Sequence, residues 1–313
     1  MNRDPIQRFE DSLIKEGLFK LEDFNNAQEK IKKLIKETLD WAKEQPDPDP
    51  AEEAIGIFAT RTTPFIKNSE QNKETMNFIS AITNTLDEIM SDNEDIFLMG
   101  EDIGSFGGAF KATQGLFEKY GEERVIDTPI SEAAFVGAAV GAALAGKIPI
   151  VELQFFDFVY PALDQLTTEA AKYHWKVGKS IPMVVRGPTG AGTRSGPFHS
   201  ISPESLLAHH PGLKVVAPST PYDAKGLLIA SINDPNPVMF LEHKKLYRKP
   251  NLKMDVPKGL YEIELGKAKV IKKGTDITIV SWSGMVGVAL EAGELLTEEG
   301  ISVEIIDIRT IVP

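Results

Sequence analysis

Brief apolar runs alternate with helix-like segments through the middle of the chain, and this alternation constrains the fold more than any other feature. The runs lack the polar alternation of a half-exposed strand, so they are typical of strands buried on both faces. The alternation predicts an α/β fold with a parallel sheet covered by helices on both faces. The expected strands are residues 96–99, 148–153, 183–186, 214–217 and 238–241, and the expected helices are 78–90, 113–120, 157–176, 203–210 and 221–232.

Two further regions flank this unit. Residues 1–55 indicate an amphipathic helical arm, which ends at the alternating prolines from Pro46 to Pro50 because proline cannot continue a helix. Residues 56–75 are expected to be a linker and residues 76–255 the α/β domain. A second, incomplete α/β domain is expected at 256–313, with strands near 267–271, 277–280 and 303–307 around a helix at 286–299.

Composition excludes several functional classes. The net charge of -12 argues against a nucleic-acid-binding protein. The chain has no cysteine, which excludes disulfides, zinc-thiolate sites and cysteine nucleophiles. No apolar run is long enough to cross a bilayer and no signal peptide is recognisable, so we expect a cytoplasmic protein without membrane contact.

The stretch from Val125 to Gly146 is the most unusual local feature. Pro129 ends a strand, Ser131 can cap a helix, and Glu132 falls in the first helical turn, where the helix dipole favours a carboxylate. The helix that follows consists largely of alanine and glycine, which predicts close packing and burial. Glu132 is therefore expected to be partly desolvated and suited to proton transfer; the alternative is that it only complements the dipole.

Two other residues are candidates for a binding site. His199 follows the glycine-containing loop 190–196, where an imidazole could exchange a proton with a ligand, unless it is an ordinary surface histidine on a connecting loop. Phe158 lies where a predicted strand passes into a helix. It is either a core residue or a flat face on which a heteroaromatic ring stacks.

Several stretches, taken together, resemble the beta subunit of the thiamine-diphosphate-dependent 2-oxo acid dehydrogenases. The similarity runs from about Met76 to Pro313. The stretches that carry it are Gly100-Glu101-Asp102, Phe106-Gly107-Gly108, Asp127-Thr128-Pro129-Ile130-Ser131-Glu132, Phe198-His199-Ser200, His210-Pro211-Gly212-Leu213-Lys214-Val215-Val216 and Tyr222-Asp223-Ala224-Lys225-Gly226-Leu227.

This resemblance implies a thiamine-diphosphate-binding fold, with a pyrimidine-binding domain and the start of a transketolase-type C-terminal domain. Glu132 matches the glutamate that hydrogen-bonds the aminopyrimidine ring and promotes its imino tautomer. Gln154 and Phe158 match cofactor-binding positions, where the aromatic side chain stacks on that ring. His199 matches the histidine in the channel through which the lipoyl group arrives.

The resemblance also implies metals and partners. Asp234 and Asn236, with main-chain groups near Met183, match a structural potassium site of some relatives. The Gly-Asp-Gly to Asn motif that holds magnesium and the diphosphate in the alpha half is absent from this chain. We therefore expect a homo- or hetero-oligomer in which an alpha portion or a second copy completes the active site, and in which a lipoylated acyltransferase core accepts the acyl group.

The arm carries a resemblance of its own. Asp4-Pro5-Ile6-Gln7-Arg8-Phe9-Glu10, with the helix and proline spacer after it, resembles the C-terminal end of the alpha subunit of the same enzymes. Our hypothesis is that the natural protein fuses alpha and beta portions and that these residues are a middle part of it. Such a fragment is expected to lack decarboxylase activity alone.

Three functions remain open from the sequence. The preferred one is oxidative decarboxylation of pyruvate, since residues 218–223 and 240–243 look most like bacterial pyruvate enzymes. A branched-chain 2-oxo acid dehydrogenase acting on 2-oxoisovalerate, or another transketolase-like or acetoin-cleaving thiamine enzyme, is the second. The third is a non-catalytic assembly module held to its partners by the small-residue helix and the arm.

Overall fold

The computed structural model describes residues 4–50, 55–67 and 72–313. It divides into two compact units, Met1–Ile55 and Gly56–Pro313. Parts of the predicted arm and linker, residues 1–3, 51–54 and 68–71, lie outside the described residues. The predicted domain limits at residues 55, 75 and 255 stay predictions.

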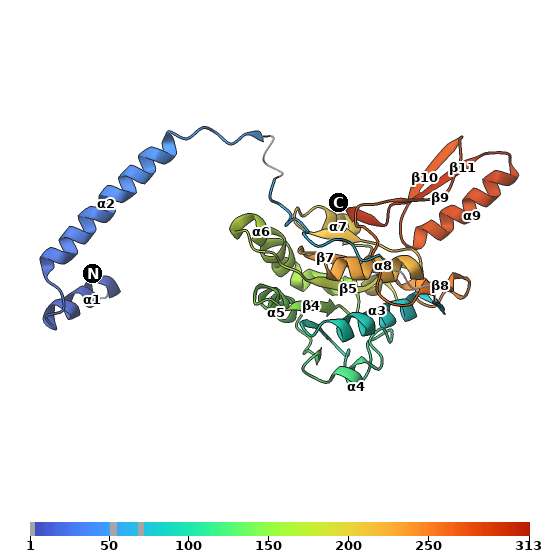
Figure 1. Cartoon of the computed structure of the whole chain (residues 1–313), viewed down its shortest axis with the longest axis horizontal. Helices are drawn as coiled ribbons and strands as arrows, with labels where there is room; N and C mark the ends of the chain where they lie inside the picture. The colour runs from blue at the N-terminus through green and yellow to red at the C-terminus, as the bar shows by residue number, and fades with distance from the viewer. Residues whose placement is uncertain (1–3, 51–54, 68–71) are drawn as a thin grey trace. The chain divides into compact units, whose positions relative to one another are not determined.

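The first unit contains two helices, α1 (Pro5–Lys15) and α2 (Leu21–Lys43), drawn in blue in Figure 1. Asp4 caps α1 by accepting a hydrogen bond from the backbone N–H of Ile6 at 2.9 Å. No residue in the described part of either helix is buried. Apolar side chains such as Phe9 and Leu34 are therefore exposed.

A seven-stranded sheet is the centre of the second unit, and it confirms the predicted α/β fold. The strand order is β12-β6-β7-β5-β4-β2-β3. All neighbours pair in parallel except β12, which runs antiparallel to β6 and was not predicted. The strands are β2 (Ile96–Gly100), β3 (Val125–Asp127), β4 (Ile148–Glu152), β5 (Val184–Thr189), β6 (Lys214–Val216), β7 (Val238–His243) and β12 (Thr310–Val312).

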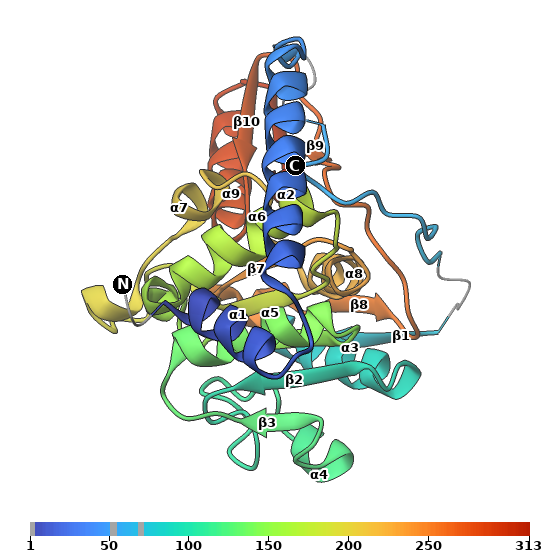
Figure 2. The ribbon, with the colours of Figure 1, turned by 90° about the vertical axis from the view of Figure 1, so that its left-hand side faces the viewer.

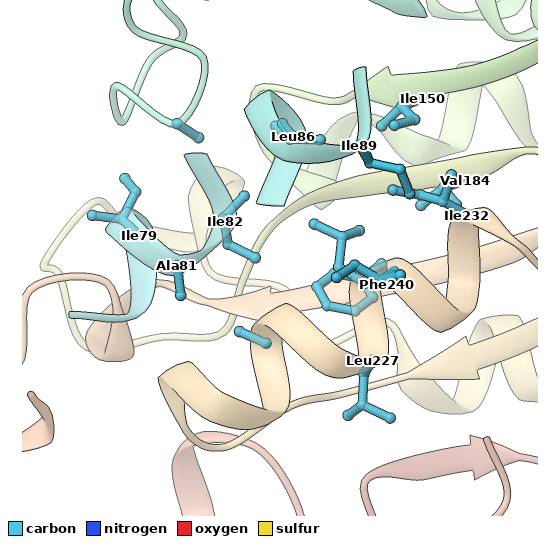
Figure 3. Close-up of a cluster of buried hydrophobic side chains, with 14 of the residues drawn as sticks. Ile79, Ala81, Ile82, Leu86, Ile89, Ile150, Val184, Leu227, Ile232 and Phe240 are labelled. Carbon is cyan, nitrogen blue, oxygen red and sulfur yellow. The ribbon is translucent and has the colours of Figure 1, made fainter. Parts of the chain in front are cut away.

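Helices cover both faces of this sheet (Figures 1 and 2). Helices α3 (Phe78–Asp92) and α8 (Pro221–Ile232) pack on one face, where Leu86, Leu227 and Phe240 belong to one buried cluster (Figure 3). The other face is covered by α5 (Glu132–Leu144), α6 (Ala171–Val177) and α7 (Glu204–Ala208) over a second cluster. A short helix, α4 (Leu116–Tyr120), lies beside β3.

A smaller sheet follows near the C-terminus. Strands β9 (Lys269–Lys272), β10 (Ile277–Ser281) and β11 (Val303–Asp307) pack with α9 (Gly284–Glu298), close to the predicted positions. An antiparallel ribbon of β1 (Lys73–Met76) and β8 (Met254–Pro257) was not predicted. Short 3-10 turns are η4 (Pro197–His199), η5 (Lys244–Leu246) and η6 (Pro250–Leu252).

Two predictions about helices need correction. The single helix predicted at 157–176 is a 3-10 segment, η2 (Phe156–Ala162), then a π-helical segment, η3 (Gln165–Ala170), then α6. Pro161 explains the first break because it cannot donate to an α-helical ladder. The small-residue helix α5 packs on η2 and η3 but is buried along one face only: Val136 and Ala139 are buried, whereas Ala134 and Ala138 are exposed.

No helix in the described residues combines the length and the apolar character needed to span a membrane.

The core predicts a clear difference between two leucines. Leu86 is fully buried in α3, so Leu86→Ala should lower the free energy of unfolding by about 2–5 kcal/mol through lost burial and a residual cavity. Leu34→Ala is the matched control, because Leu34 is 61% exposed. This substitution should change the free energy of unfolding by less than about 0.5 kcal/mol. Urea unfolding followed by circular dichroism measures both; equal effects would contradict the assigned core.

Candidate active site

The carboxyl ends of β2, β3, β4, β5 and β7 meet at one edge of the parallel sheet. The segments that follow these strands carry most of the residues predicted for the site. Ligands of open parallel sheets bind outside this edge, because the loops there converge while the strands below hold them in place. This edge is therefore the candidate active site.

A buried ionic cluster joins three of these strands. Arg186 on β5 is fully buried and donates to both carboxylate oxygens of Glu242 on β7, at 2.6 and 2.7 Å, and to Glu152 on β4. The hydroxyl of Tyr247 donates to Glu242 at 2.8 Å. Burial raises the pKa of Glu152, an effect that the charge of Arg186 opposes. Because these groups bond to one another, we infer that they form the floor of the site.

A glycine-containing loop, residues 104–108, rests on the ends of β3 and β4. The backbone N–H of Gly104 donates to Asp127 at 2.7 Å. A Cβ atom on Gly104 would collide with the same carboxylate, and one on Gly108 would lie 2.8 Å from Glu152 Oε1. Only glycine allows so close an approach, so the loop position depends on these two residues.

Two carboxylates lie near each other beside this loop. Glu132 begins α5 and is partly exposed, so a ligand can reach it. Glu101 directly follows β2, is 7% exposed, and has a buried Oε1 atom without a hydrogen-bond partner. Burial, and then the charges of Glu132 and Asp102, raise the pKa of Glu101. The buried Glu101 oxygen lacks a partner, and the Glu132 carboxylate beside it is accessible to a ligand. Together they fit a ligand that donates hydrogen bonds.

Aromatic side chains gather around His199. Its ring contacts Phe155 edge-on at 4.4 Å between centroids and Phe158 at 5.7 Å. Both Phe158 and His199 are half-buried. Asp157 holds the turn behind the imidazole by accepting hydrogen bonds from the backbone N–H groups of the two residues after His199, at 2.9 and 3.1 Å. The cluster therefore presents ring surfaces at the edge of the sheet.

Gln154 connects the carboxylates to the aromatic cluster. Its side-chain amide donates to Asp102 at 2.7 Å, and Asp102 is adjacent to Glu101 in the chain. The structure thus brings Glu132, Gln154, Phe158 and His199 to one edge of the sheet. Their roles stay predictions, but their common location fits the pattern implied by the sequence.

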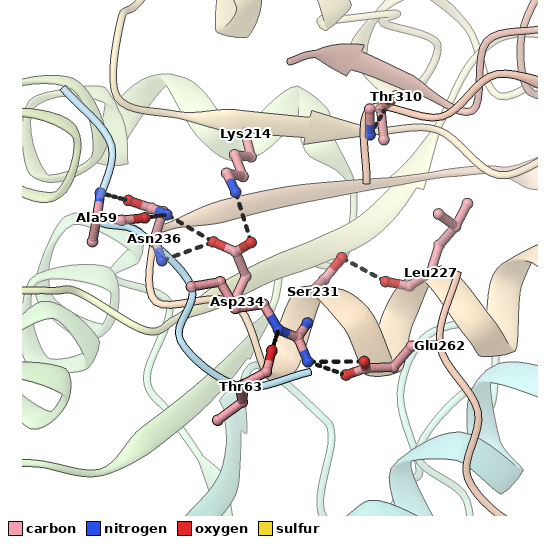
Figure 4. Close-up of polar contacts among 11 residues, drawn as sticks. Ala59, Thr63, Lys214, Leu227, Ser231, Asp234, Asn236, Glu262 and Thr310 are labelled. Atoms are coloured by element: carbon pink, nitrogen blue, oxygen red, sulfur yellow. Dashed lines mark hydrogen bonds and ion pairs between the residues drawn. The ribbon is translucent and has the colours of Figure 1, made fainter. Parts of the chain in front are cut away.

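The residues predicted for potassium lie elsewhere, near the amino ends of β5 and β7 (Figure 4). Asp234 accepts from Lys214 Nζ at 2.6 Å and from Asn236. Asn236 pairs with the backbone of Ala59 through both its oxygen, at 2.7 Å, and its nitrogen, at 2.9 Å. The Met183 carbonyl accepts from the backbone of β7.

These contacts do not fit a potassium site. An ammonium group already lies against the Asp234 carboxylate, and the Asn236 oxygen, which would have to bind the ion, accepts from the chain itself.

Sequence reasoning missed several residues of this edge. Glu101, Arg186 and Glu242 were not given a role, although Glu101 directly follows β2, Glu242 lies at the end of β7, and Arg186 follows the apolar residues that begin β5. A charged residue that ends an otherwise apolar run is the signal that could have found them. Lys244, which directly follows β7, is 4% exposed and its Nζ atom has no hydrogen-bond partner; it was also missed, because its burial depends on contacts with residues far away in the chain.

Family comparisons cover most of the chain. The description "Transketolase, pyrimidine binding domain" matches residues 74–250, and "Transketolase, C-terminal domain" matches residues 266–313. "Dehydrogenase E1 component" matches residues 1–51. A solved structure titled "Split gene transketolase, inactive beta4 tetramer" shares the fold, with a TM-score of 0.54 and 20% identity over 75% of this chain and 71% of that chain.

Curated relatives are more similar in sequence. The chain is 52% identical to the pyruvate dehydrogenase E1 component subunit beta of Acholeplasma laidlawii, over 75% of this chain and 72% of the relative. It is 47% identical to the 2-oxoisovalerate dehydrogenase subunit beta of Bacillus subtilis, over 76% and 73%. The chain therefore belongs to the family of the E1 beta subunits of 2-oxo acid dehydrogenases.

Proposed function

We propose that this chain supplies the pyrimidine-binding half of a thiamine diphosphate site in the decarboxylating component of a 2-oxo acid dehydrogenase complex. The observation that carries the proposal is the gathering of Glu132, Gln154, Phe158 and His199 at one sheet edge in a member of the E1 beta family. Such an edge is where an α/β fold binds a cofactor.

The residues present fit one ring of this cofactor. Glu132 offers a reachable carboxylate, Glu101 offers a buried oxygen without a partner, and Phe158 offers a half-exposed ring face. In the proposed site Glu132 would exchange a proton with a ring nitrogen of the pyrimidine, and Phe158 would stack on the ring face. When bound, thiamine diphosphate supplies the electron sink for decarboxylation.

His199 is proposed to act later, when the acyl group leaves for a lipoyl group of the acyltransferase core. Its imidazole lies on the aromatic cluster and is held from behind by the Asp157-bound turn. From this position the imidazole would donate or accept a proton at the edge of the sheet.

The proposed active site is completed by an alpha portion. Residues 1–51 match an E1 component description while the rest matches transketolase-type domains, which supports the hypothesis that one polypeptide joins alpha-type and beta-type segments. Magnesium and the diphosphate would be held by that alpha portion. Intact mass of the native product tests the fusion: a product that begins at Met1 and ends at Pro313 would contradict it.

Glu132→Gln should lower the rate of 2-oxo acid decarboxylation by about 100-fold or more in the enzyme assembled with its alpha portion, because an amide cannot give and take back a proton as a carboxyl group does. Assembly, measured by gel filtration, should not change. Glu118→Gln is the matched control, since Glu118 also occupies the first turn of a helix, α4, but is exposed away from the site. Unchanged turnover by Glu132→Gln would favour the assembly-module alternative.

Pyruvate is the proposed substrate, since the relative with 52% identity is a pyruvate enzyme and the one with 47% is a 2-oxoisovalerate enzyme. We expect a higher kcat/KM for pyruvate than for 2-oxoisovalerate in the assembled enzyme. The reverse order would assign it to the branched-chain alternative, and acetoin cleavage would assign it to another thiamine enzyme class.

The 313-residue chain by itself should show no decarboxylation of either 2-oxo acid, because it lacks the Gly-Asp-Gly to Asn motif for magnesium and diphosphate. Carbon dioxide release is the measurement. Turnover by the purified chain would show that it holds the whole cofactor and would overturn the half-site proposal.

A further inference from the structure

The loop that joins β5 to His199 has a closed base and an exposed tip. Its first residue, Gly190, directly follows β5, and the backbone N–H of this glycine donates to the carbonyl of Ile201 at 2.7 Å. Residues 191–198, between these two ends, are exposed. His199 lies near the closed end, so its position depends on the contacts that hold the base of the loop.

His243, the last residue of β7, lies directly against this base. Strand β7 pairs with β5 so that His243 is the neighbour of Thr189, the residue before Gly190. A Cβ atom on Gly190 would collide with the His243 Nε2 atom, and one on Gly192 would collide with the Lys245 side chain. Both glycines also have positive φ, +80° and +103°. The loop therefore approaches the end of β7 as closely as glycine allows.

The imidazole of His243 also contacts the start of α9. A Cβ atom on Gly284, the first residue of that helix, would lie 2.9 Å from its Cδ2 and Cγ atoms. The Nδ1 atom accepts a hydrogen bond from the backbone N–H of Lys245 at 3.3 Å, so the ring is neutral and carries its proton on Nε2. Burial, and then the charges of Lys244 and Lys245, lower the pKa of His243 and favour this neutral form.

The turn that contains His199 is held from another direction. Asp157, in η2, accepts hydrogen bonds from the backbone N–H groups of Ser200 and Ile201 at 2.9 and 3.1 Å. His243 contacts the other end of the same loop at Gly190, and the bond from Gly190 to Ile201 joins the two ends. A change at His243 is therefore transmitted to the His199 turn through a short chain of contacts.

We propose that His243 is a positioning residue, which holds the base of the loop at Gly190 and thereby sets the place of His199 on the aromatic cluster. Proton transfer by His243 itself fits less well, because Nδ1 already accepts the bond from Lys245 and Nε2 lies against Gly190. The effect on catalysis rests on the role of His199 in the proposed function. The effect on the loop does not.

Hydrogen exchange of the 313-residue chain, followed by mass spectrometry, tests the contact with the loop. His243→Ala should speed exchange in peptides that cover residues 190–201 about threefold or more, because the bonds at the loop base open more often. Exchange in α3 is the internal reference for global unfolding. If His243→Ala fails to fold, His243→Asn replaces it, since the amide oxygen can still accept from Lys245.

His210→Ala is the matched control, because His210 is also a half-buried histidine but lies outside this loop. It should leave exchange of residues 190–201 within about twofold. Gly190→Ala tests the same contact from the loop side, since the added methyl group would collide with the His243 ring. Its effect should be smaller in the His243→Ala background, where the collision is relieved. Additive effects of the two substitutions would contradict the contact.

The assembled enzyme tests the consequence for catalysis. His243→Ala should slow acyl transfer to a lipoylated domain about tenfold or more, because a displaced His199 no longer meets the reacting group in the right geometry. Decarboxylation measured with an artificial electron acceptor should stay within about twofold, and His210→Ala should change neither rate. A purely structural role of His243 would instead lower both rates equally.

Unchanged exchange of residues 190–201 in the His243 variant, or an equal loss of both rates, would overturn the proposal. Inactivity of the unaltered assembled enzyme would count against the proposed function instead. The exchange measurement would still decide in that case whether His243 holds the loop, because it requires neither thiamine diphosphate nor turnover.

Discussion

The buried contact among Arg186, Glu152 and Glu242 is the interaction on which the candidate site depends. It joins β4, β5 and β7 at the edge where their loops emerge. A buried ion pair need not add stability, because the cost of removing water from the charges can equal their attraction. We infer that its main effect is geometric: the guanidinium fork sets the relative position of three neighbouring strands, and hence of the loops that follow them.

Carboxylates also fix the positions of the loops that lie above this cluster. Asp127, the last residue of β3, and Asp157, in η2, each hold a loop by accepting backbone hydrogen bonds. Glu101 keeps a buried oxygen without a hydrogen-bond partner, and Glu132 and Phe158 are partly exposed. A buried ionic floor below partly exposed side chains is consistent with the half-site proposed above.

Much of this arrangement could be predicted from the order of residues. The apolar runs around Ile150 and Val185 correctly predicted β4 and β5. Pro129 and Glu132 correctly predicted a turn and the start of α5. The motif resemblance correctly indicated the family. The prediction was less successful where packing decides: α5 is buried on one face only, and the segment after Phe156 is not a single α-helix. Asp234 accepts a hydrogen bond from Lys214, and Asn236 accepts one from Ala59. Neither pairing could be predicted from a local sequence pattern.

The sequence by itself determined the fold class, the family and the candidate residues, because hydrophobic periodicity and turn chemistry are local and motifs are read in order. Only the tertiary structure decided which charged side chains form ion pairs with one another. Arg186 and Glu242 are paired, whereas Lys244 is buried without an acceptor. Both outcomes depend on strand order and on contacts between residues far apart in the chain, and these properties follow from the packing of the whole sheet rather than from any one segment.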